Sequence, residues 1–194
     1  MKIFLIRHGQ TTGDLEDRYG GDYDDHLTEV GRTQATDLAE KLINKGIEKI
    51  FASPLIRAQE TAEIINQKLS VSTETFEDLR ERNQYGILTG MVKSEAKEKY
   101  PKEVELLKDY RNTITGAESY TDFSERFGKS LEKIFGSNFQ SVAIITHGSG
   151  PIKYIFREVL KEGEVKVEDC GFAELNYTDG KLSLVSLSGI KIVR

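Results

Sequence analysis

Two of the three histidines follow an apolar run and precede a glycine. The run in IFLIRHG ends at His8 and Gly9, and the run in VAIITHG ends at His147 and Gly148. Ligands of open α/β sheets bind beyond the carboxyl ends of the strands. If the two runs are neighbouring strands, both imidazoles lie at one edge of the sheet, where a neutral imidazole can act as a nucleophile.

Two arginines accompany these histidines. Arg7 directly precedes His8, and Arg57 follows a third apolar run, IEKIFAS, within the first turn of an expected helix. The planar guanidinium matches the oxygens of a phosphate, and Gly9 allows backbone N–H groups to approach an anion closely. These residues predict phosphoryl transfer to a histidine, with the arginines stabilising charge. Because side chains supply the positive charge, we expect no metal and no cofactor.

Phosphoryl transfer also needs a proton for the leaving oxygen. The segment FEDLRERNQYGILTG offers three carboxyl groups, those of Glu77, Asp78 and Glu81. The residues alone leave these three as alternatives. A second acidic stretch, DYDDH, ends at His26 and is interpreted as an exposed loop rather than a cation site.

The spacing of apolar residues predicts the elements that position these groups. Short apolar runs predict strands, and apolar residues three and four apart predict helices. We expect strands over residues 2–6, 47–52 and 142–146, a loop over 10–26, helices over 28–45, 53–69 and 121–135, short helices over 94–100 and 102–111, a helix from Pro151, and a hairpin of 172–177 with 181–187. This order predicts an α/β fold, a three-layer αβα arrangement with a mostly parallel central sheet and an antiparallel edge strand.

The composition is typical of a soluble globular protein. The chain has 194 residues, of which 38% are hydrophobic and 30% are charged, and we expect a single domain over residues 1–194. The net charge of −5 disfavours nucleic acid as a partner, and no apolar stretch reaches the length that spans a membrane. The single Cys170 and the lack of a signal peptide predict a cytoplasmic location.

Several sequence blocks carry a resemblance to a known family. RHG stands at Arg7 to Gly9, DDHLTEVGRTQA starts at Asp24, SPLIRAQETA starts at Ser53, LRERNQYGILTG starts at Leu79, GAES starts at Gly116, and THG ends at Gly148. In these blocks and in their order the chain resembles the histidine phosphatase superfamily, the phosphoglycerate-mutase-like proteins, and in particular their phosphatase branch. RHG alone is a weak signal, whereas the ordered blocks cover most of the chain.

The resemblance implies a role for each candidate site residue. His8 becomes the phosphohistidine nucleophile and Glu81 the proton donor, while Arg7, Arg57 and His147 hold the phosphoryl group. It also implies phosphate contacts from Gly9, Thr11, Asp14 and Gly148, and a short helical cap insertion over residues 83–120 that selects the substrate.

Two positions depart from the pattern of the family. The family often has asparagine six residues after the nucleophile, where this chain has Asp14. A carboxylate beside a phosphate is unfavourable unless it is protonated, paired or turned away. Glu81 stands five residues before Gly86 instead of the usual four, which a one-residue bulge can absorb, and Asp78 stays the alternative proton donor.

The expected function is that of a metal-independent phosphatase that hydrolyses small phosphomonoesters through a phosphohistidine on His8. The short cap and the scattered basic residues Arg82, Lys93 and Arg111 favour this reading over phosphoryl transfer of the phosphoglycerate mutase type. A non-catalytic phosphate-binding module is the other alternative. The expected partner is a small phosphorylated metabolite, and the natural substrate and the oligomeric state stay open.

Overall fold

The computed structural model describes residues 1–193. Its strands are β1 (Lys2–Arg7), β2 (Lys49–Ala52), β3 (Ser72–Thr75), β4 (Ser141–Thr146), β5 (Glu164–Thr178) and β6 (Lys181–Val193). Its helices are α1 (Thr12–Leu15), α2 (Glu29–Leu42), α3 (Ile56–Leu69), α4 (Lys93–Lys99), α5 (Pro101–Leu106) and α6 (Tyr120–Phe135), with short helical turns η1 (Ile43–Lys45), η2 (Glu77–Leu79), η3 (Gly86–Leu88), η4 (Gly148–Ile152) and η5 (Ile155–Val159).

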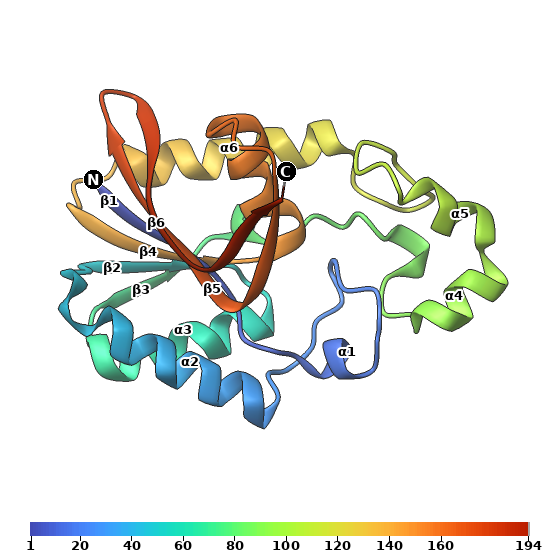
Figure 1. Ribbon diagram of the computed structural model, residues 1–194, viewed down its shortest axis with the longest axis horizontal. Coiled ribbons are helices and arrows are strands. Elements are labelled where there is room, and N and C mark those ends of the chain that lie inside the picture. The colour runs from blue at the N-terminus through green and yellow to red at the C-terminus, as the bar shows by residue number, and fades with distance from the viewer. Residues whose placement is uncertain (194) are drawn as a thin grey trace.

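The strands form one six-stranded sheet in the order β3-β2-β4-β1-β5-β6. The pairs β3–β2, β2–β4 and β4–β1 are parallel, whereas β5 runs antiparallel to β1 and forms a hairpin with β6 (Figure 1). The mostly parallel sheet with an antiparallel edge is therefore confirmed. The antiparallel part is the expected C-terminal hairpin, and its strands β5 and β6 are longer than the expected ranges 172–177 and 181–187.

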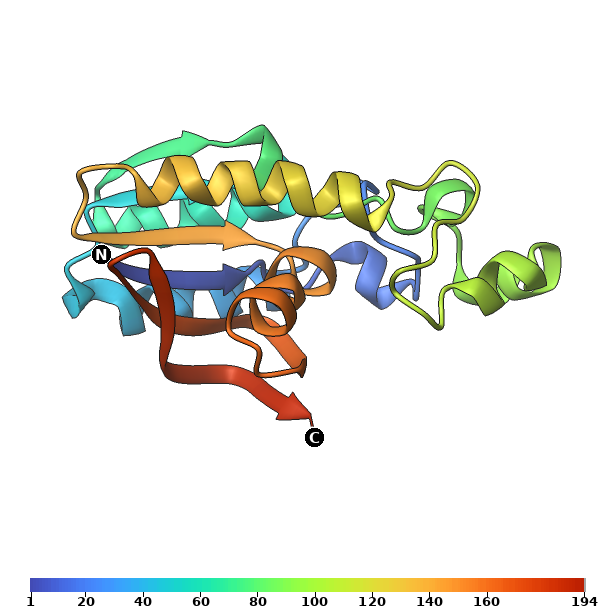
Figure 2. The same cartoon turned by 90° about the horizontal axis from the view of Figure 1, so that it is seen from above.

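Helices cover both faces of the sheet, which confirms the three-layer architecture. Successive side chains of a strand point to opposite faces. On β1, Phe4 and Ile6 pack against α2 and α3, whereas Ile3 and Leu5 belong to the core under α6. In Figure 1, α6 lies above the strands and α2 and α3 lie below them, and in Figure 2, which is seen from above, α6 runs in front of the sheet. Strand β1 is thus buried on both faces, which explains its uninterrupted apolar sequence.

Helix α6 joins the sheet to the segment that lies beyond it. Ser119 caps its N-terminus by accepting a hydrogen bond from the backbone N–H of Asp122 (3.0 Å). Phe123 and Phe127 are fully buried, and their rings stack with centroids 5.7 Å apart. Burying each ring contributes about 1.5–3 kcal/mol. The apolar face of α6 therefore fixes the helix on the sheet.

The segment between β3 and α6 extends past the carboxyl ends of the strands (Figure 1). Leu88, Ala96 and Ile114 form a small separate apolar cluster within it. The buried Arg82 ties this segment together, because its guanidinium donates hydrogen bonds to the backbone carbonyls of Tyr110, Asn112 and Glu118. The cap thus has a core of its own, which is much smaller than the two cores of the sheet.

Three local features differ from the sequence-based expectations. Strand β3 has the polar and fully exposed sequence STET, which carries no apolar period, and it forms by pairing with β2. Helix α1 lies in the expected loop because Thr11 and Asp14 form a capping box. Helix α3 begins at Ile56 and not at Pro54, since the Asp24 carboxylate, distant in sequence, accepts a hydrogen bond from the Ile56 N–H (2.7 Å).

Candidate active site

The carboxyl ends of β1 and β4 bring the two predicted histidines together. Arg7 pairs with Thr146 in the parallel register, so His8 and His147 are the next residues on neighbouring strands. Their rings are buried, with centroids 5.1 Å apart. A pocket of about 210 Å³ opens at this place. Its lining includes Arg7, His8, Thr11, Asp14, Arg57, Glu81 and Gly148, and the cap adds Tyr85 and Lys93.

The hydrogen bonds of His8 leave its Nε2 atom without a proton. Nδ1 lies 2.8 Å from the Gly9 carbonyl oxygen, to which it donates, and Nε2 accepts from Nε of Arg57 (3.2 Å). Burial lowers the pKa of His8 well below its usual range, and the charges of Arg57 and Arg7 lower it further. His8 is therefore a neutral imidazole with a lone pair on Nε2, which is the form that attacks phosphorus.

Gly9 is held by contacts within the protein, and its expected phosphate contact stays a prediction. Its N–H donates to the hydroxyl of Thr61 (3.2 Å), and a Cβ atom at this position would lie 2.6 Å from the Gly31 carbonyl oxygen. Gly9 is also absent from the lining of the pocket. The glycine is thus required for close packing of β1 against the start of α2, and its carbonyl oxygen orients His8.

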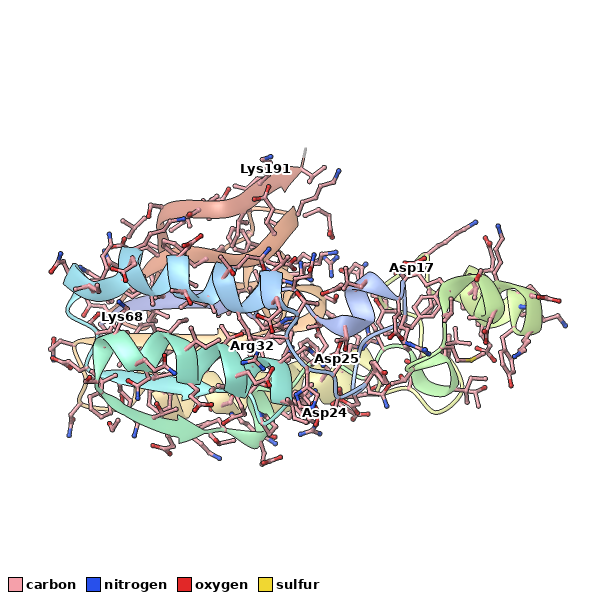
Figure 3. The ribbon with its side chains drawn as sticks, turned by 90° about the horizontal axis from the view of Figure 1, so that it is seen from below. Asp17, Asp24, Asp25, Arg32, Lys68 and Lys191 are labelled. Carbon is pink, nitrogen blue, oxygen red and sulfur yellow. The ribbon has the colours of Figure 1, made fainter. Side chains whose placement is uncertain are left out.

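Arg57 is held in place by the loop before α2. One terminal nitrogen donates to the Tyr23 carbonyl oxygen (2.6 Å) and lies 3.0 Å from the Asp25 carboxylate, and the other donates to the Gly21 carbonyl oxygen (2.9 Å). Asp25 is buried, so the expectation that DYDDH is an exposed loop is wrong for this residue. Figure 3 shows Asp24 and Asp25 side by side near the start of α3. The role of Asp25 in holding Arg57 was not predictable from the sequence, because the two residues are 32 positions apart.

Strand β5 orients Arg7. The guanidinium donates to the Val167 carbonyl oxygen (2.7 Å) and forms an ion pair with Asp169 (3.0 Å). An irregular stretch of β5 between Val167 and Phe172 breaks the register with β6, and Cys170, in this stretch, donates its N–H to the His8 carbonyl oxygen (3.1 Å). This stretch therefore supports His8 and the adjacent Arg7. No sequence motif singles out Asp169.

Asp14 is paired and turned toward its own helix. Its Oδ2 atom accepts hydrogen bonds from both the N–H and the hydroxyl of Thr11 (3.0 Å each), and its other oxygen lies 3.8 Å from the Arg7 guanidinium. Both residues line the pocket. The carboxylate of Asp14 thus has hydrogen-bond and ion-pair partners within the protein.

Glu81 is a buried carboxyl group in the wall of the pocket. Its Oε1 atom accepts from the N–H groups of Arg82 (2.9 Å) and Gly150 (2.8 Å), and Oε2 accepts from the N–H of Ser149 (3.1 Å). Burial raises the pKa of Glu81, although the backbone hydrogen bonds and the charge of Arg57 oppose this shift. Asp78, the alternative donor, is absent from the pocket lining and lies 3.8 Å from Arg80. The geometry therefore favours Glu81.

His147 lies beside His8 without lining the pocket. Its Nε2 atom shares a hydrogen bond of 2.7 Å with the hydroxyl of Ser53, a residue that sequence reasoning treated only as a helix start. Nδ1 is buried and has no hydrogen-bond partner among residues 1–193. Burial, together with the charge of Arg57, lowers the pKa of His147 well below its usual range. A buried nitrogen without a partner is costly unless a ligand supplies one.

The assembled groups suit transfer of a phosphoryl group. A neutral imidazole lies next to two guanidinium groups, and a buried carboxyl group lies across the same pocket. In the described part of the chain, no group of three or more His, Cys, Asp or Glu side chains is arranged to hold a metal ion. No helix in that part is both long enough and apolar enough to cross a membrane.

Comparison with known proteins identifies a family and relatives of this chain. The family model described as "Histidine phosphatase superfamily (branch 1)" matches residues 3–189. The metal-independent phosphoserine phosphatase of Arabidopsis thaliana is 33% identical over 168 residues, covering 81% of this chain and 68% of that protein. The probable phosphoglycerate mutase GpmB of Yersinia pestis is 26% identical over 189 residues, covering 92% of this chain and 86% of that protein.

The same fold occurs in a solved structure, that of the mycobacterial glucosyl-3-phosphoglycerate phosphatase Rv2419c with VO3. It superimposes with a TM-score of 0.84 at 24% identity and covers 97% of this chain and 98% of that chain. Other relatives are longer. The chain spans 45% of the length of the bifunctional protein Rv2228c of Mycobacterium tuberculosis, to which it is 32% identical over 165 residues, or 84% of this chain.

Proposed function

The chain belongs to the histidine phosphatase superfamily, and we propose on that basis that it is a metal-independent phosphatase of small phosphomonoesters. The observation that carries the proposal is the state of His8. Its unprotonated Nε2 atom lies in a pocket between two guanidinium groups and a buried carboxyl group. This arrangement provides a nucleophile, charge stabilisation and a proton donor without a further group.

The proposed reaction has two steps. First, Nε2 of His8 attacks phosphorus, the bond to the ester oxygen breaks, and Glu81 gives its proton to the leaving alcohol. Arg7, Arg57 and His147 hold the phosphoryl oxygens as their charge changes. Second, water attacks phospho-His8 while the Glu81 carboxylate accepts a proton from it, so phosphate leaves and both residues return to their starting state.

The cap supports selectivity for the alcohol part of the substrate. Tyr85 and Lys93 belong to residues 83–120 and line the same pocket as Arg7 and His8. We propose that this segment selects the substrate and that residues 1–194 work as one domain. The names of the relatives, a phosphoserine phosphatase and a glucosyl-3-phosphoglycerate phosphatase, support a small phosphorylated metabolite as substrate.

The test is release of phosphate from a panel of phosphomonoesters, with a chelator present, by the wild type and by His8→Ala. We expect turnover by the wild type only, because the first step forms a bond to Nε2. Rapid quenching under alkaline conditions should trap an acid-labile phosphoprotein in the wild type. His26→Ala is the matched control, since His26 is exposed and paired with Glu60 away from the pocket.

A mutase assay and a phosphate-binding measurement separate the alternatives. The name of the GpmB relative favours phosphoglycerate mutase activity as the second candidate, and movement of the phosphoryl group between positions of phosphoglycerate would establish it. Phosphate binding without turnover, changed by His8→Ala only in affinity, would instead establish a non-catalytic binding module.

A further inference from the structure

Ser53 is a fully buried serine whose backbone is fixed beside His147. It directly follows β2, and its N–H donates to the Ile145 carbonyl oxygen of β4 (2.9 Å). Its own carbonyl oxygen accepts a hydrogen bond from the side chain of Gln59 on α3. Since His147 is fully buried as well, the serine hydroxyl and the imidazole meet without access to water.

The hydroxyl of Ser53 makes two hydrogen bonds. It accepts from the N–H of Leu55 (3.3 Å), and it lies 2.7 Å from Nε2 of His147. A hydroxyl has one proton to donate. The structure gives this hydroxyl no further hydrogen-bond partner within residues 1–193, so Nε2 of His147 is the acceptor available for its proton.

The two tautomers of His147 satisfy these groups differently. Burial and the charge of Arg57 hold the pKa of His147 well below its usual range, so the ring is neutral and has one proton. If Nε2 has the proton, the hydroxyl proton of Ser53 lacks an acceptor and the buried lone pair of Nδ1 lacks a donor. If Nδ1 has it, the hydroxyl donates to Nε2, and only the Nδ1–H group is left without a partner. Because an unsatisfied buried polar group is costly, the second tautomer is favoured.

The favoured tautomer is complementary to a phosphoryl group. Ionised phosphoryl oxygens accept hydrogen bonds, so an N–H group attracts them and a lone pair repels them. In the proposed reaction His147 holds one of these oxygens, and its Nε2 atom is already bonded to Ser53. Nδ1 is the nitrogen left for the substrate, and it is also the buried atom without a partner.

We propose that Ser53 is a positioning residue, which fixes His147 in the tautomer whose Nδ1–H donates to a phosphoryl oxygen. The inference rests on the proposed function. Which ring nitrogen of a histidine is protonated is set by the hydrogen bond that the other nitrogen makes. Ser53 is absent from the lining of the pocket, so it acts through His147 and does not touch the substrate.

The first test observes the tautomer directly. The chain has only three histidines, so a protein with ¹⁵N-labelled histidine gives few ring signals, and His147→Gln identifies those of His147. The two ring nitrogens are distinct, and each reports whether it is protonated. We expect the proton of His147 on Nδ1 in the wild type and a loss of this preference in Ser53→Ala. A proton on Nε2 in the wild type, or an unchanged preference in Ser53→Ala, would overturn the proposal.

The second test measures the dissociation constant of orthovanadate by calorimetry and needs no turnover. Ser53→Ala should weaken binding roughly tenfold, as expected for loss of one hydrogen bond to a charged group. Ser53→Thr keeps the hydroxyl and should restore most of the affinity. Ser130→Ala is the matched control, because Ser130 is equally buried and its hydroxyl donates to the Phe127 carbonyl oxygen within α6. Equal affinities of Ser53→Ala and Ser130→Ala would contradict the proposal.

A double-mutant cycle separates this role from a structural one. Ser53 also accepts the Leu55 N–H just before α3, the helix that includes Arg57. If Ser53 acts through His147, Ser53→Ala should not change the vanadate constant further in a His147→Gln background. The same loss in both backgrounds would mean that Ser53 acts through α3, which would end the proposal.

The outcome does not depend on whether Ser53→Ala folds or on turnover. If Ser53→Ala does not fold, Ser53→Cys takes its place, since a thiol is of similar size and only a weak donor. If no ester is hydrolysed by the wild type, the proposed function fails. The tautomer of His147 and the vanadate constants still decide what Ser53 does.

Discussion

His8 and Glu81 are both buried, and burial favours the neutral form of each side chain. For the imidazole this means a pKa below its usual range, and for the carboxyl group a pKa above it. The proposed first step needs these two neutral forms together, a free lone pair on Nε2 and a proton on the acid. One physical cause, removal from water, therefore prepares nucleophile and proton donor for the same reaction.

These shifts predict the pH dependence of kcat/KM. Activity should be lost on the acidic side only below the usual pKa range of histidine, where His8 gains a proton. On the alkaline side it should fall as Glu81 loses its proton, above the usual range of a glutamate. Glu81→Gln should reduce kcat for alkyl phosphates roughly 100-fold, within the usual range for a general acid, and remove the alkaline fall.

The pH profile of p-nitrophenyl phosphate hydrolysis provides the control for Glu81. Its leaving group needs little protonation, so Glu81→Gln should affect the first step with this ester far less. An alkaline fall that persists in Glu81→Gln would assign the titration to another group. Asp78→Asn, which changes a carboxylate outside the pocket, should leave the profile unchanged.

At the scale of elements, the site is the product of strand ends and of long-range contacts that hold them. The apolar runs before His8 and His147 and the parallel pairing of their strands were predictable from the sequence, because buried strands have a distinctive composition. Asp25, Ser53 and Asp169 were not predictable, since each contacts its site partner only after the chain has folded. Gly9 was expected at the site, whereas the hydrogen bond from its N–H to the Thr61 hydroxyl was not predictable from the sequence.

Helix α6 positions the segment that carries Glu81. The Arg126 guanidinium donates to the carbonyl oxygens of Asp78 (3.0 Å), Arg80 (3.1 Å) and Glu81 (2.9 Å), and it pairs with Glu118 (2.6 Å). One side chain of α6 therefore fixes both the backbone at Glu81, the proposed proton donor, and Glu118 in the last part of the cap. No other described contact of α6 joins these two segments so directly.

We predict that Arg126→Lys displaces Glu81 without unfolding the protein, because a single ammonium group lacks the guanidinium fork and cannot reach all of these acceptors. A displacement of about 1 Å lowers kcat for alkyl phosphates roughly 10–100-fold. The ratio of kcat for p-nitrophenyl phosphate to kcat for an alkyl phosphate should rise, because only the alkyl ester depends on Glu81. An equal loss for both esters would mean that Arg126 is only structural. Lys129→Met, an exposed change on the same helix, should alter neither rate.

At the scale of the whole molecule, the pocket lies where the sheet and the cap meet, and both must be in place for it to exist. The cap cluster of Leu88, Ala96 and Ile114 is small, so little apolar burial holds the cap by itself. Its order depends on Arg82, which directly precedes the cap, and on Arg126 of α6. The polar residues of this segment carry no apolar period that predicts their structure, because the two guanidinium groups of Arg82 and Arg126 hold them in place.

This dependence predicts that cap and sheet unfold together in a single transition. The chain has no tryptophan, so Tyr100→Trp, placed between α4 and α5, gives fluorescence from the cap alone, while calorimetry reports the whole molecule.

Orthovanadate at 100 times its dissociation constant should stabilise the fold by about 2.7 kcal/mol and raise the fluorescence and calorimetric midpoints equally, by about 5–10 °C. Arg7→Met should abolish that rise, since it removes a phosphate ligand. An earlier fluorescence midpoint that vanadate does not move would show instead that the cap unfolds independently and that the pocket is only partly assembled without substrate.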